Sequence, residues 1–454
     1  MFSNDELAKK KEIAELLNAV VTYYDLSDVD YDDSNRPLSN ILVALKDNIS
    51  TKDVRTTASS RSLDNYVPIY NATVVSKLEE AGAILYAKTS MDELGMGGSN
   101  LHAYTGPVKN PYDLKRVSGG SSGGSAALVS SGVVPMAIGT DTGDSVRKPA
   151  SYCGIVGFKP TYGRISRWGV IPYASSLDHV GFFTRNIKDS ALLLEVLSGR
   201  DDNDMTSSYR PVEKYTEYLN EPKNKVIGVL KNVYNLIDEP LKLEFDKLIE
   251  SLKGEGYTVK MVEVDDELLI SIFVTYYVIA NAEATSNHSN IDGLKFGVRE
   301  AGDTVDDIMV NSRTKGFSIN TRKRMVFGGY SLNEENYSDV LLKAQKIRRL
   351  IVDEFKKKFE EVDFIMAPAH NQRPQLIDET PAPNDDRQMI IENFMVFANF
   401  NGYPSITVPF TTINELPFGV NITGLPFEEK QLLRVSQSVE DVCMMKDKIA
   451  KVTK

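Results

Sequence analysis

The sequence contains very little cysteine or histidine. Its 454 residues include two cysteines, Cys153 and Cys443, and four histidines. Two isolated cysteines form neither a disulfide framework nor the spacing of a metal-binding motif, so we expect both to be structural and we expect no metal site. None of the histidines lies in an esterase motif, and the chain has no Gly-x-Ser-x-Gly elbow. These absences argue against a disulfide-stabilised fold and against a histidine-dependent serine hydrolase.

Long apolar runs and targeting signals are also missing. The first eleven residues are charged and include acidic side chains, without the apolar core of a signal peptide. The longest nearly apolar run, residues 268–280, is too short to span a bilayer and predicts a buried helix. We therefore expect a non-secreted protein with no membrane partner.

The chain has fewer basic than acidic residues. Lysine and arginine number 52 against 63 acidic residues, which gives a net charge of −11 and a pI of about 5.1. Such a chain is a poor primary surface for nucleic acid, so any nucleic acid should be held mainly by a partner. The sequence also lacks a phosphate-binding Gly-Lys-Ser/Thr loop, so we expect no ATP site in this chain.

A stretch rich in glycine and serine is the most informative part of the sequence. Residues 119–126 read Gly-Gly-Ser-Ser-Gly-Gly-Ser-Ala, and residues 139–147 read Gly-Thr-Asp-Thr-Gly-Asp-Ser-Val-Arg. Glycine lets a backbone turn tightly and approach a ligand, and successive N–H groups in such turns can bind negative charge. A serine in this setting is a candidate nucleophile with an oxyanion hole beside it.

Lys46 is the candidate base for such a serine. It ends the apolar run of residues 41–45, which predicts a buried strand with a lysine at its end. Burial lowers the pKa of a lysine and can leave its amine neutral, and therefore basic, near pH 7. Serine–lysine arrangements are a known variant of the catalytic triad. The structural alternative is a buried ion pair of Lys46 with Asp47 or Asp141.

Lys46, the Gly-Ser loop and the Thr-Gly-x-Ser-x-Arg run, taken at their spacings, resemble the amidase signature enzymes. The resemblance implies a Ser-cisSer-Lys triad in which Ser145 is the nucleophile and Lys46 is the base. Ser121 would follow a cis peptide bond and relay the proton between them. The backbone N–H groups of Thr142, Gly143 and Asp144 are the expected oxyanion hole.

Neighbouring polar residues have plainer interpretations. Ser122 and Ser125 are expected to be loop and helix-cap residues rather than catalytic ones. Arg147 is expected to hold the loop as a structural guanidinium.

Further stretches resemble one subfamily, the A subunits of glutamyl-tRNA(Gln)/aspartyl-tRNA(Asn) amidotransferases. They include residues 54–57, 70–75, 91–94, 159–164, 175–178, 282–287 and 343–348. The resemblance implies a glutaminase that hydrolyses glutamine and delivers ammonia to a B subunit, with a small third subunit completing a heterotrimer. ATP and Mg²⁺ are then expected on the partner subunit, which would also hold most of the misacylated tRNA, in the cytoplasm or in the mitochondrial matrix.

The same resemblance assigns three substrate-binding residues. Arg348 would clamp the glutamine α-carboxylate, because a guanidinium suits bidentate recognition; otherwise it belongs to a solvated basic helix face. Glu392 would take the place of a family aspartate that holds the substrate's amino group. Phe296 stands where relatives carry a tyrosine, so the ring remains and the hydroxyl is lost.

Two further features depart from the family pattern. Asp144 replaces a glycine before the nucleophile, and its carboxylate should point away from the oxyanion hole. The N-terminal part is shorter than in typical relatives, which puts contacts with the small subunit in doubt.

Helical and strand-like segments alternate along the chain, which predicts an α/β fold with a large mixed central sheet covered by helices on both faces. The expected helices include residues 5–24, 338–361 and 387–400. We expect a shortened helical segment over residues 1–34 and a single amidase signature domain over residues 35–454.

Two other functions remain possible from the sequence. A stand-alone amidase would act on another small amide and would need no partner. A non-catalytic scaffold subunit is suggested by Asp144, although the intact Lys46, Ser121 and Ser145 argue against it.

Overall fold

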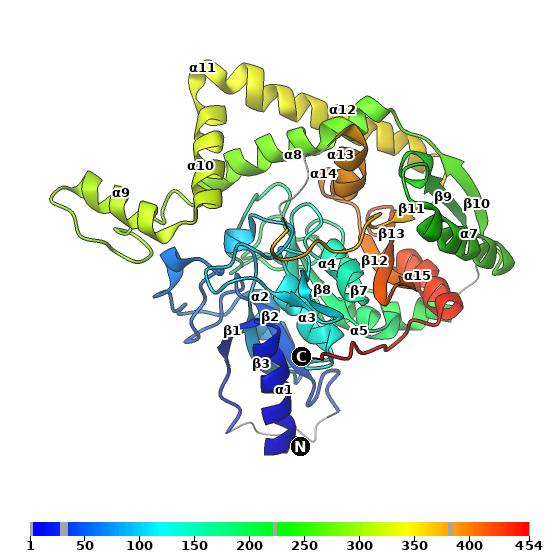
Figure 1. Cartoon of the computed structure of the whole chain (residues 1–454), viewed down its shortest axis with the longest axis horizontal. Coiled ribbons are helices and arrows are strands. Elements are labelled where there is room, and N and C mark those ends of the chain that lie inside the picture. The colour runs from blue at the N-terminus through cyan, green and yellow to red at the C-terminus, as the bar shows by residue number, and fades with distance from the viewer. Residues whose placement is uncertain (1–2, 28–34, 221–224, 380–384, 454) are drawn as a thin grey trace.

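Eleven strands form one mixed sheet, with helices on both of its faces (Figure 1). The computed structural model describes residues 3–27, 35–220, 225–379 and 385–453. The strand order is β1-β3-β2-β6-β8-β7-β12-β13-β11-β9-β10. Strands β3, β2 and β6 run parallel to one another, as do β11, β9 and β10, while the strands between these groups pair antiparallel. The predicted α/β class with a large mixed sheet is confirmed.

The strands are short and mostly buried. They are β1 (Val20–Tyr23), β2 (Leu42–Lys46), β3 (Ile84–Thr89), β6 (Met136–Asp141), β7 (Val156–Lys159), β8 (His179–Thr184), β9 (Val226–Leu230), β10 (Thr258–Val262), β11 (Phe364–Pro368), β12 (Ser405–Ile413) and β13 (Leu416–Gly424). A separate two-stranded ribbon pairs β4 (Lys109–Asn110) with β5 (Asp113–Val117).

The helices fall into groups over the sheet. They are α1 (Asn4–Leu16), α2 (Thr73–Glu80), α3 (Gly123–Ser130), α4 (Arg147–Cys153), α5 (Ile187–Leu197), α6 (Lys231–Tyr234), α7 (Glu239–Gly254), α8 (Asp266–Asn287), α9 (Val305–Gly316), α10 (Ile319–Leu332), α11 (Glu334–Tyr337), α12 (Lys343–Phe359), α13 (Asp386–Asn393), α14 (Phe397–Phe400) and α15 (Glu429–Cys443). Apolar residues of α2, α5, α7 and α15 share one core cluster, and those of α1, α3 and α4 share another.

Strand β2 divides its side chains between these two clusters. Val43 and Leu45 belong to the core under α2, α5, α7 and α15, whereas Leu42 and Ala44 belong to the core under α1, α3 and α4. Because side chains alternate along a strand, Lys46 falls on the same face as Leu42 and Ala44. The pleat therefore turns the lysine toward the loop that begins α3.

Helices α8, α10, α11 and α12 form an arm at one end of the molecule, beyond which α9 projects (Figure 1). Among the described helices, α8 is long and apolar enough to cross a membrane, and 50% of its most apolar stretch is buried inside the fold. The apolar run predicted to be too short to span a bilayer is part of a longer helix, Asp266–Asn287, so the predicted length is wrong. Contacts with α10, α12 and α13 account for the buried part, as expected for a core helix.

Three predicted helices differ from the observed ones. The helix predicted over residues 5–24 ends at Leu16, because Asn18 adopts a φ of +53° and the β-branched run that follows forms β1 against β3. The helix predicted over residues 338–361 begins with a π-turn, Ser338–Leu342, before α12. The helix predicted over residues 387–400 is broken between α13 and α14.

The sequence predicts a boundary after residue 34, between a helical N-terminal segment and the main domain. The described part of that segment contains both α1 and β1. Strand β1 belongs to the main sheet. Residue 34 itself lies outside the described residues, so the boundary stays a prediction.

Two adjacent glycines in α10 give a test of how the arm is held. A Cβ on Gly328 would lie 2.1 Å from the carbonyl oxygen of Asn281 and 2.2 Å from Thr285 Oγ1 in α8, whereas a Cβ on Gly329 would meet nothing within 4 Å. We expect Gly328→Ala to lower the free energy of unfolding by about 1–3 kcal/mol through overpacking. Gly329→Ala, the matched control, should raise it by about 0.4–1 kcal/mol, because alanine loses less backbone entropy in a helix. Urea unfolding measures both, and equal effects would show that α8 and α10 do not pack this closely.

Candidate active site

Lys46, at the end of β2, reaches the Gly-Ser loop directly. Its Nζ lies 2.8 Å from Ser121 Oγ, 2.8 Å from Ser122 Oγ and 3.2 Å from the carbonyl oxygen of Thr140. Ser122 Oγ in turn donates to that same carbonyl at 3.0 Å. The lysine is fully buried. The structure therefore brings together the amine and hydroxyl that the sequence predicts as partners.

No carboxylate neutralises Lys46 among the residues that the structure describes. The two candidates for an ion pair are engaged elsewhere: Asp47 lies 3.7 Å from Lys88 Nζ, and Asp141 lies 2.9 Å from Arg147. Burial lowers the pKa of Lys46 to about 7, against the weaker pull of more distant carboxylates. Near neutral pH the amine is therefore partly unprotonated and able to accept a proton, as the predicted base requires.

The Gly120–Ser121 peptide bond is cis, as the family resemblance implies. The loop packs tightly on Asp92, since a Cβ on Gly120 would lie 2.2 Å from Asp92 Oδ2. The Asp92 N–H donates to the carbonyl oxygen of Ser121 at 3.1 Å, and its carboxylate accepts from the Asn100 N–H at 2.8 Å. Asp92 thus ties the serine loop to the neighbouring glycine-rich turn.

Ser145 lies in the turn between β6 and α4 and is 4% exposed. Its carbonyl oxygen accepts the Ser122 N–H at 3.3 Å, which places the two serine segments side by side. Among the described residues, the N–H groups of Thr142, Gly143 and Asp144 donate no hydrogen bond, and neither does the Ser145 hydroxyl. Donors left unused beside a serine are what a developing oxyanion needs.

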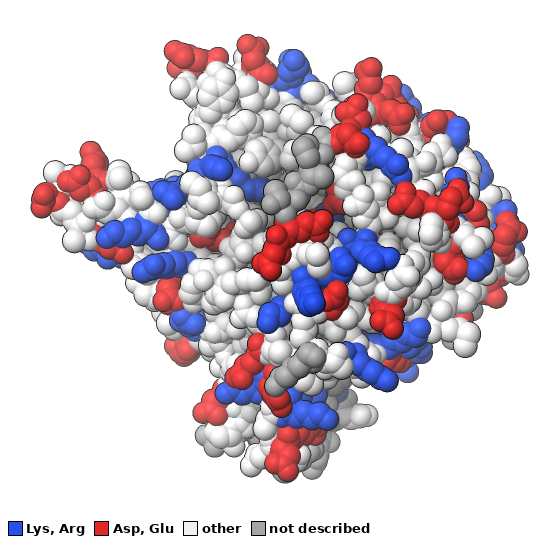
Figure 2. All heavy atoms as spheres, viewed as in Figure 1, with Lys and Arg blue, Asp and Glu red and all other residues white. Residues whose placement is uncertain are grey.

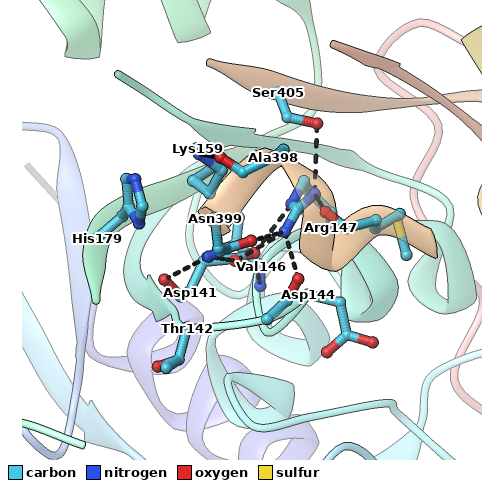
Figure 3. A network of polar contacts seen from close by, with 12 residues as sticks. Asp141, Thr142, Asp144, Val146, Arg147, Lys159, His179, Ala398, Asn399 and Ser405 are labelled. Atoms are coloured by element: carbon cyan, nitrogen blue, oxygen red, sulfur yellow. Dashed lines mark hydrogen bonds and ion pairs between the residues drawn. The ribbon is translucent and has the colours of Figure 1, made fainter. Parts of the chain in front are cut away.

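Arg147 organises the same turn from within (Figure 3). It is fully buried and binds both carboxylate oxygens of Asp141, at 3.1 and 2.9 Å, together with the carbonyl oxygen of Gly143 at 2.5 Å. It also donates to Asn399 Oδ1 at 2.7 Å and to the carbonyl oxygen of Met395 at 2.8 Å. Burial raises the pKa of Asp141, but Arg147 outweighs it and holds that pKa well below its usual range. All these contacts agree with a structural guanidinium.

The Asp144 side chain points out of this network (Figure 3). Its Oδ2 lies 3.0 Å from Lys148 Nζ, which lies 2.8 Å from Glu392 Oε2. The other Glu392 oxygen accepts from Gln388 Nε2 at 3.0 Å. Within the described part of the chain, Glu392 is therefore linked to the Ser145 loop only through Lys148 and Asp144. Its predicted contact with a substrate amine stays a prediction.

A cavity of about 220 Å³ adjoins Thr142, in the loop of residues 142–144 that is predicted to form the oxyanion hole and that we call the oxyanion loop. Its lining includes Asn48, Thr140, Thr142, Tyr173, Asp178 and His179. Asp178 accepts a hydrogen bond from Thr142 Oγ1 at 2.7 Å and one from the Tyr173 N–H at 2.8 Å. Burial raises the pKa of Asp178 to about 6. The carboxylate thereby orients the Thr142 side chain at the edge of the cavity.

Arg348 stands behind the turn that carries Asp178. Its guanidinium donates to Ser176 Oγ at 3.1 Å and to the carbonyl oxygen of Phe400 at 3.1 Å, and it lies over the Phe400 ring. These contacts exclude the purely solvated helix face. None of them is to the Ser145 loop, so the carboxylate clamp stays a prediction.

Phe296 lies away from this cavity. Its ring is 51% exposed and packs edge-on against Tyr66, in a second hollow of about 390 Å³ that also includes Tyr70 and Trp168. The two hollows share the wall formed by Trp168 and residues 170–172. A contact between Phe296 and substrate stays a prediction.

Two features of the site go beyond what the sequence indicates. Ser122 binds Lys46 as closely as Ser121 does, and the sequence gives no means to rank two adjacent serines. Lys148 follows Asp144 by four residues. This spacing brings two side chains together when the backbone between them is helical, so it suggests an ion pair. In the described ranges, no group of three His, Cys, Asp or Glu side chains is placed to hold a metal ion.

Comparison with known proteins decides the family. A family model described as Amidase matches residues 12–433, nearly the whole chain. The chain belongs to the amidase signature family. The matched region includes Lys46, Ser121 and Ser145, so the constellation described above lies inside it.

Two relatives of this amidase and one solved structure carry the same name. A Natranaerobius thermophilus protein, named as the A subunit of glutamyl-tRNA(Gln) amidotransferase, is 42% identical over 410 residues, covering 89% of this chain and 82% of that protein. A Lactobacillus acidophilus protein with the same name is 39% identical over 446 residues, covering 96% and 92%. A crystal structure of the A subunit of glutamyl-tRNA(Gln) amidotransferase from Thermotoga maritima is also similar. It matches with a TM-score of 0.81 at 34% identity, and the match covers 99% of this chain and 94% of that one.

The pH dependence of amide hydrolysis tests Lys46 as a base. The neutral amine is the active form, and burial moves its pKa from 10.5 to about 7. We therefore expect kcat/KM to rise about tenfold per pH unit below that pKa and to level off above it. Lys46→Arg should be inactive at every pH although folded by circular dichroism, since a guanidinium stays charged. A profile that continues to rise well into the alkaline range, or an active Lys46→Arg enzyme, would contradict the role.

Proposed function

We propose that this amidase is the glutaminase, or A, subunit of a tRNA-dependent amidotransferase. The observation that carries the proposal is the buried Lys46 amine, 2.8 Å from Ser121 Oγ and without a carboxylate partner among the described residues, beside a serine loop with unused N–H donors. The relatives named as A subunits of glutamyl-tRNA(Gln) amidotransferase support the choice of glutamine as the amide.

The first half of the reaction forms an ester on Ser145. Its Oγ attacks the side-chain amide carbon of glutamine, while its proton moves to Ser121 and the Ser121 proton moves to Lys46 Nζ. The N–H groups of the oxyanion loop stabilise the negative oxygen of the tetrahedral intermediate. When the C–N bond breaks, Lys46 returns the proton through Ser121 to the departing nitrogen. Ammonia leaves, and a glutamyl ester remains on Ser145.

Water completes the cycle by the same relay. It attacks the ester carbon and gives its proton through Ser121 to Lys46, and the proton then returns to Ser145 as glutamate departs. Arg348 and Glu392 hold the α-carboxylate and α-amine in this proposal. Both already have protein partners, so glutamine must join or replace those contacts.

The ammonia is consumed on a second subunit in this proposal. That B subunit binds ATP and Mg²⁺ and activates Glu-tRNA(Gln), and Asp-tRNA(Asn) where both are substrates, and a small third subunit completes the complex. The net charge of −11 supports leaving tRNA to the partner. On the face in Figure 2, acidic and basic side chains are interspersed rather than gathered into a basic track. The compartment is the cytoplasm or the mitochondrial matrix.

Replacing the nucleophile separates the two half-reactions. In the assembled complex we expect Ser145→Ala to lose glutamine hydrolysis by at least about 10³-fold, because no ester can form. Amidation of Glu-tRNA(Gln) with added ammonium chloride should persist, since free ammonia needs no glutaminase. Ammonia release and tRNA-bound glutamine are measured in parallel. A Ser145→Ala complex that hydrolyses glutamine normally, or a wild-type protein that hydrolyses other amides but not glutamine, would contradict the proposal and favour a stand-alone amidase.

Arg348 gives a second test, with its neighbour as the control. A charge-assisted bidentate pair contributes about 1.5–3 kcal/mol, so Arg348→Ala should raise the KM for glutamine about tenfold or more. Arg349 is exposed and pairs with Asp353 on its own helix at 2.7 Å, so Arg349→Ala should leave KM unchanged. Ammonia-dependent amidation should survive in both variants. Loss of both activities in Arg348→Ala would make this residue structural rather than a clamp.

A further inference from the structure

A charged cluster beside Ser145 takes no part in the proton relay. It consists of Asp144, Lys148 and Glu392, with Lys148 Nζ between the two carboxylates at 3.0 and 2.8 Å. The three side chains are 15%, 11% and 24% exposed, so solvent screens their charges little. Buried charges of this kind interact more strongly than surface pairs, and the removal of one partner strands the others.

The cluster joins two segments that are far apart in the sequence. Lys148 lies in the first turn of α4 and Asp144 in the loop before that helix, and the Lys148 N–H also donates to the carbonyl oxygen of Asp144 at 2.8 Å. Glu392 lies near the end of α13, and Gln388 of the same helix fixes its second oxygen. Lys148 is therefore held from two sides and cannot leave Asp144 without breaking its bond to Glu392.

Asp144 occupies an unfavourable place for a carboxylate. Its own N–H is one of the unused donors of the oxyanion loop, and its side chain belongs to the residue directly before Ser145. A negative charge there would oppose the oxyanion that forms when Ser145 attacks an amide. Lys148 supplies the opposite charge within hydrogen-bond distance and draws the carboxylate toward α13.

The pKa directions of Lys148 and Glu392 fit this arrangement. The pKa of Asp144 is raised by burial, and Lys148 opposes that rise by favouring the charged carboxylate. Burial lowers the pKa of Lys148, but the two carboxylates outweigh burial and raise it well above its ordinary value. Burial raises the pKa of Glu392, but Lys148 outweighs burial and lowers it. Lys148 is thus a fixed cation, in contrast to Lys46, whose burial is not compensated by a contact with a carboxylate of the described residues.

We propose that Lys148 is a positioning residue for catalysis: it neutralises the Asp144 carboxylate, holds it out of the oxyanion hole, and is itself anchored by Glu392. The inference rests on the proposed function only in taking Ser145 as the nucleophile. It applies to whichever amide the enzyme hydrolyses.

A double-mutant cycle tests the pair. Lys148→Gln should lower kcat about tenfold or more, because the uncompensated charge of Asp144 acts on the transition state. The KM for glutamine is not diagnostic here, since Lys148 also holds Glu392. Asp144→Asn alone should lower kcat less than Lys148→Gln does, and adding it to Lys148→Gln should restore kcat to within about threefold of Asp144→Asn. Lys225→Gln removes the same charge from the pair with Asp363, at 3.1 Å and partly exposed, and should leave kcat unchanged.

Recovery in the double variant separates compensation from a merely structural role. A double variant as slow as Lys148→Gln, or a Lys148→Gln enzyme of normal kcat, would overturn the proposal. If Lys148→Gln does not fold, the double variant decides alone: the proposal expects a folded enzyme near the kcat of Asp144→Asn, and a folded inactive one contradicts it.

The choice of substrate distinguishes a failure of this proposal from a failure of the proposed glutaminase function. Each variant is assayed with glutamine and with an unrelated anilide amide. A wild-type enzyme that hydrolyses the anilide but not glutamine ends the glutaminase proposal, while the cycle is still read with the anilide. If the double variant does not regain kcat with any amide that the wild-type enzyme hydrolyses, the compensation proposal is wrong.

Discussion

A buried lysine amine without a carboxylate partner is the constraint on which the site depends. Lys46 has hydroxyl and carbonyl oxygens around Nζ and nothing within reach, among the described residues, that would fix it as an ammonium ion. An isolated charge in this environment is costly, so the group moves toward its neutral form. The pleat of β2, the tight serine loop and the packing of Asp92 all serve to hold a neutral amine against Ser121.

Three other buried cations have carboxylate partners. Among the described residues, Lys159 does not: it is fully buried, its Nζ donates to carbonyl oxygens only, and burial lowers its pKa well below the ordinary value. Lys88 lies near Asp47, Arg147 binds Asp141 through two nitrogens, and Lys148 sits between two carboxylates. These paired cations have structural or electrostatic roles, since removal of one partner would strand a buried charge. The contrast of Lys46 with Arg147 and Lys148 explains how the site contains both a proton acceptor and fixed positive charges. Lys88 is intermediate, because burial lowers its pKa to about 8 despite Asp47.

Much of the site follows from local sequence, and much does not. The end of β2 at Lys46 follows from an apolar run, and the α/β architecture follows from alternating elements. The cis bond before Ser121 is implied by the family resemblance and not by the residues alone. The surroundings of Phe296 could not be predicted from the sequence. Its hollow is formed by residues from the first quarter of the chain and from a distant turn. Likewise Glu392 meets Lys148 only through tertiary structure, since 244 residues separate them. The Asp144–Lys148 spacing is local and visible, but its meaning depends on α4, which has no counterpart among the predicted helices.

The most direct measurement is the titration of Lys46 itself. Carbon-13 labelling of the lysine ε-carbons reports the protonation of each amine by NMR, and the signal missing from Lys46→Arg identifies this residue. A midpoint near pH 7 is expected, since burial lowers the pKa to about 7. A midpoint near the ordinary lysine value of 10.5 would mean that the amine is a permanent cation and would contradict its role as the base.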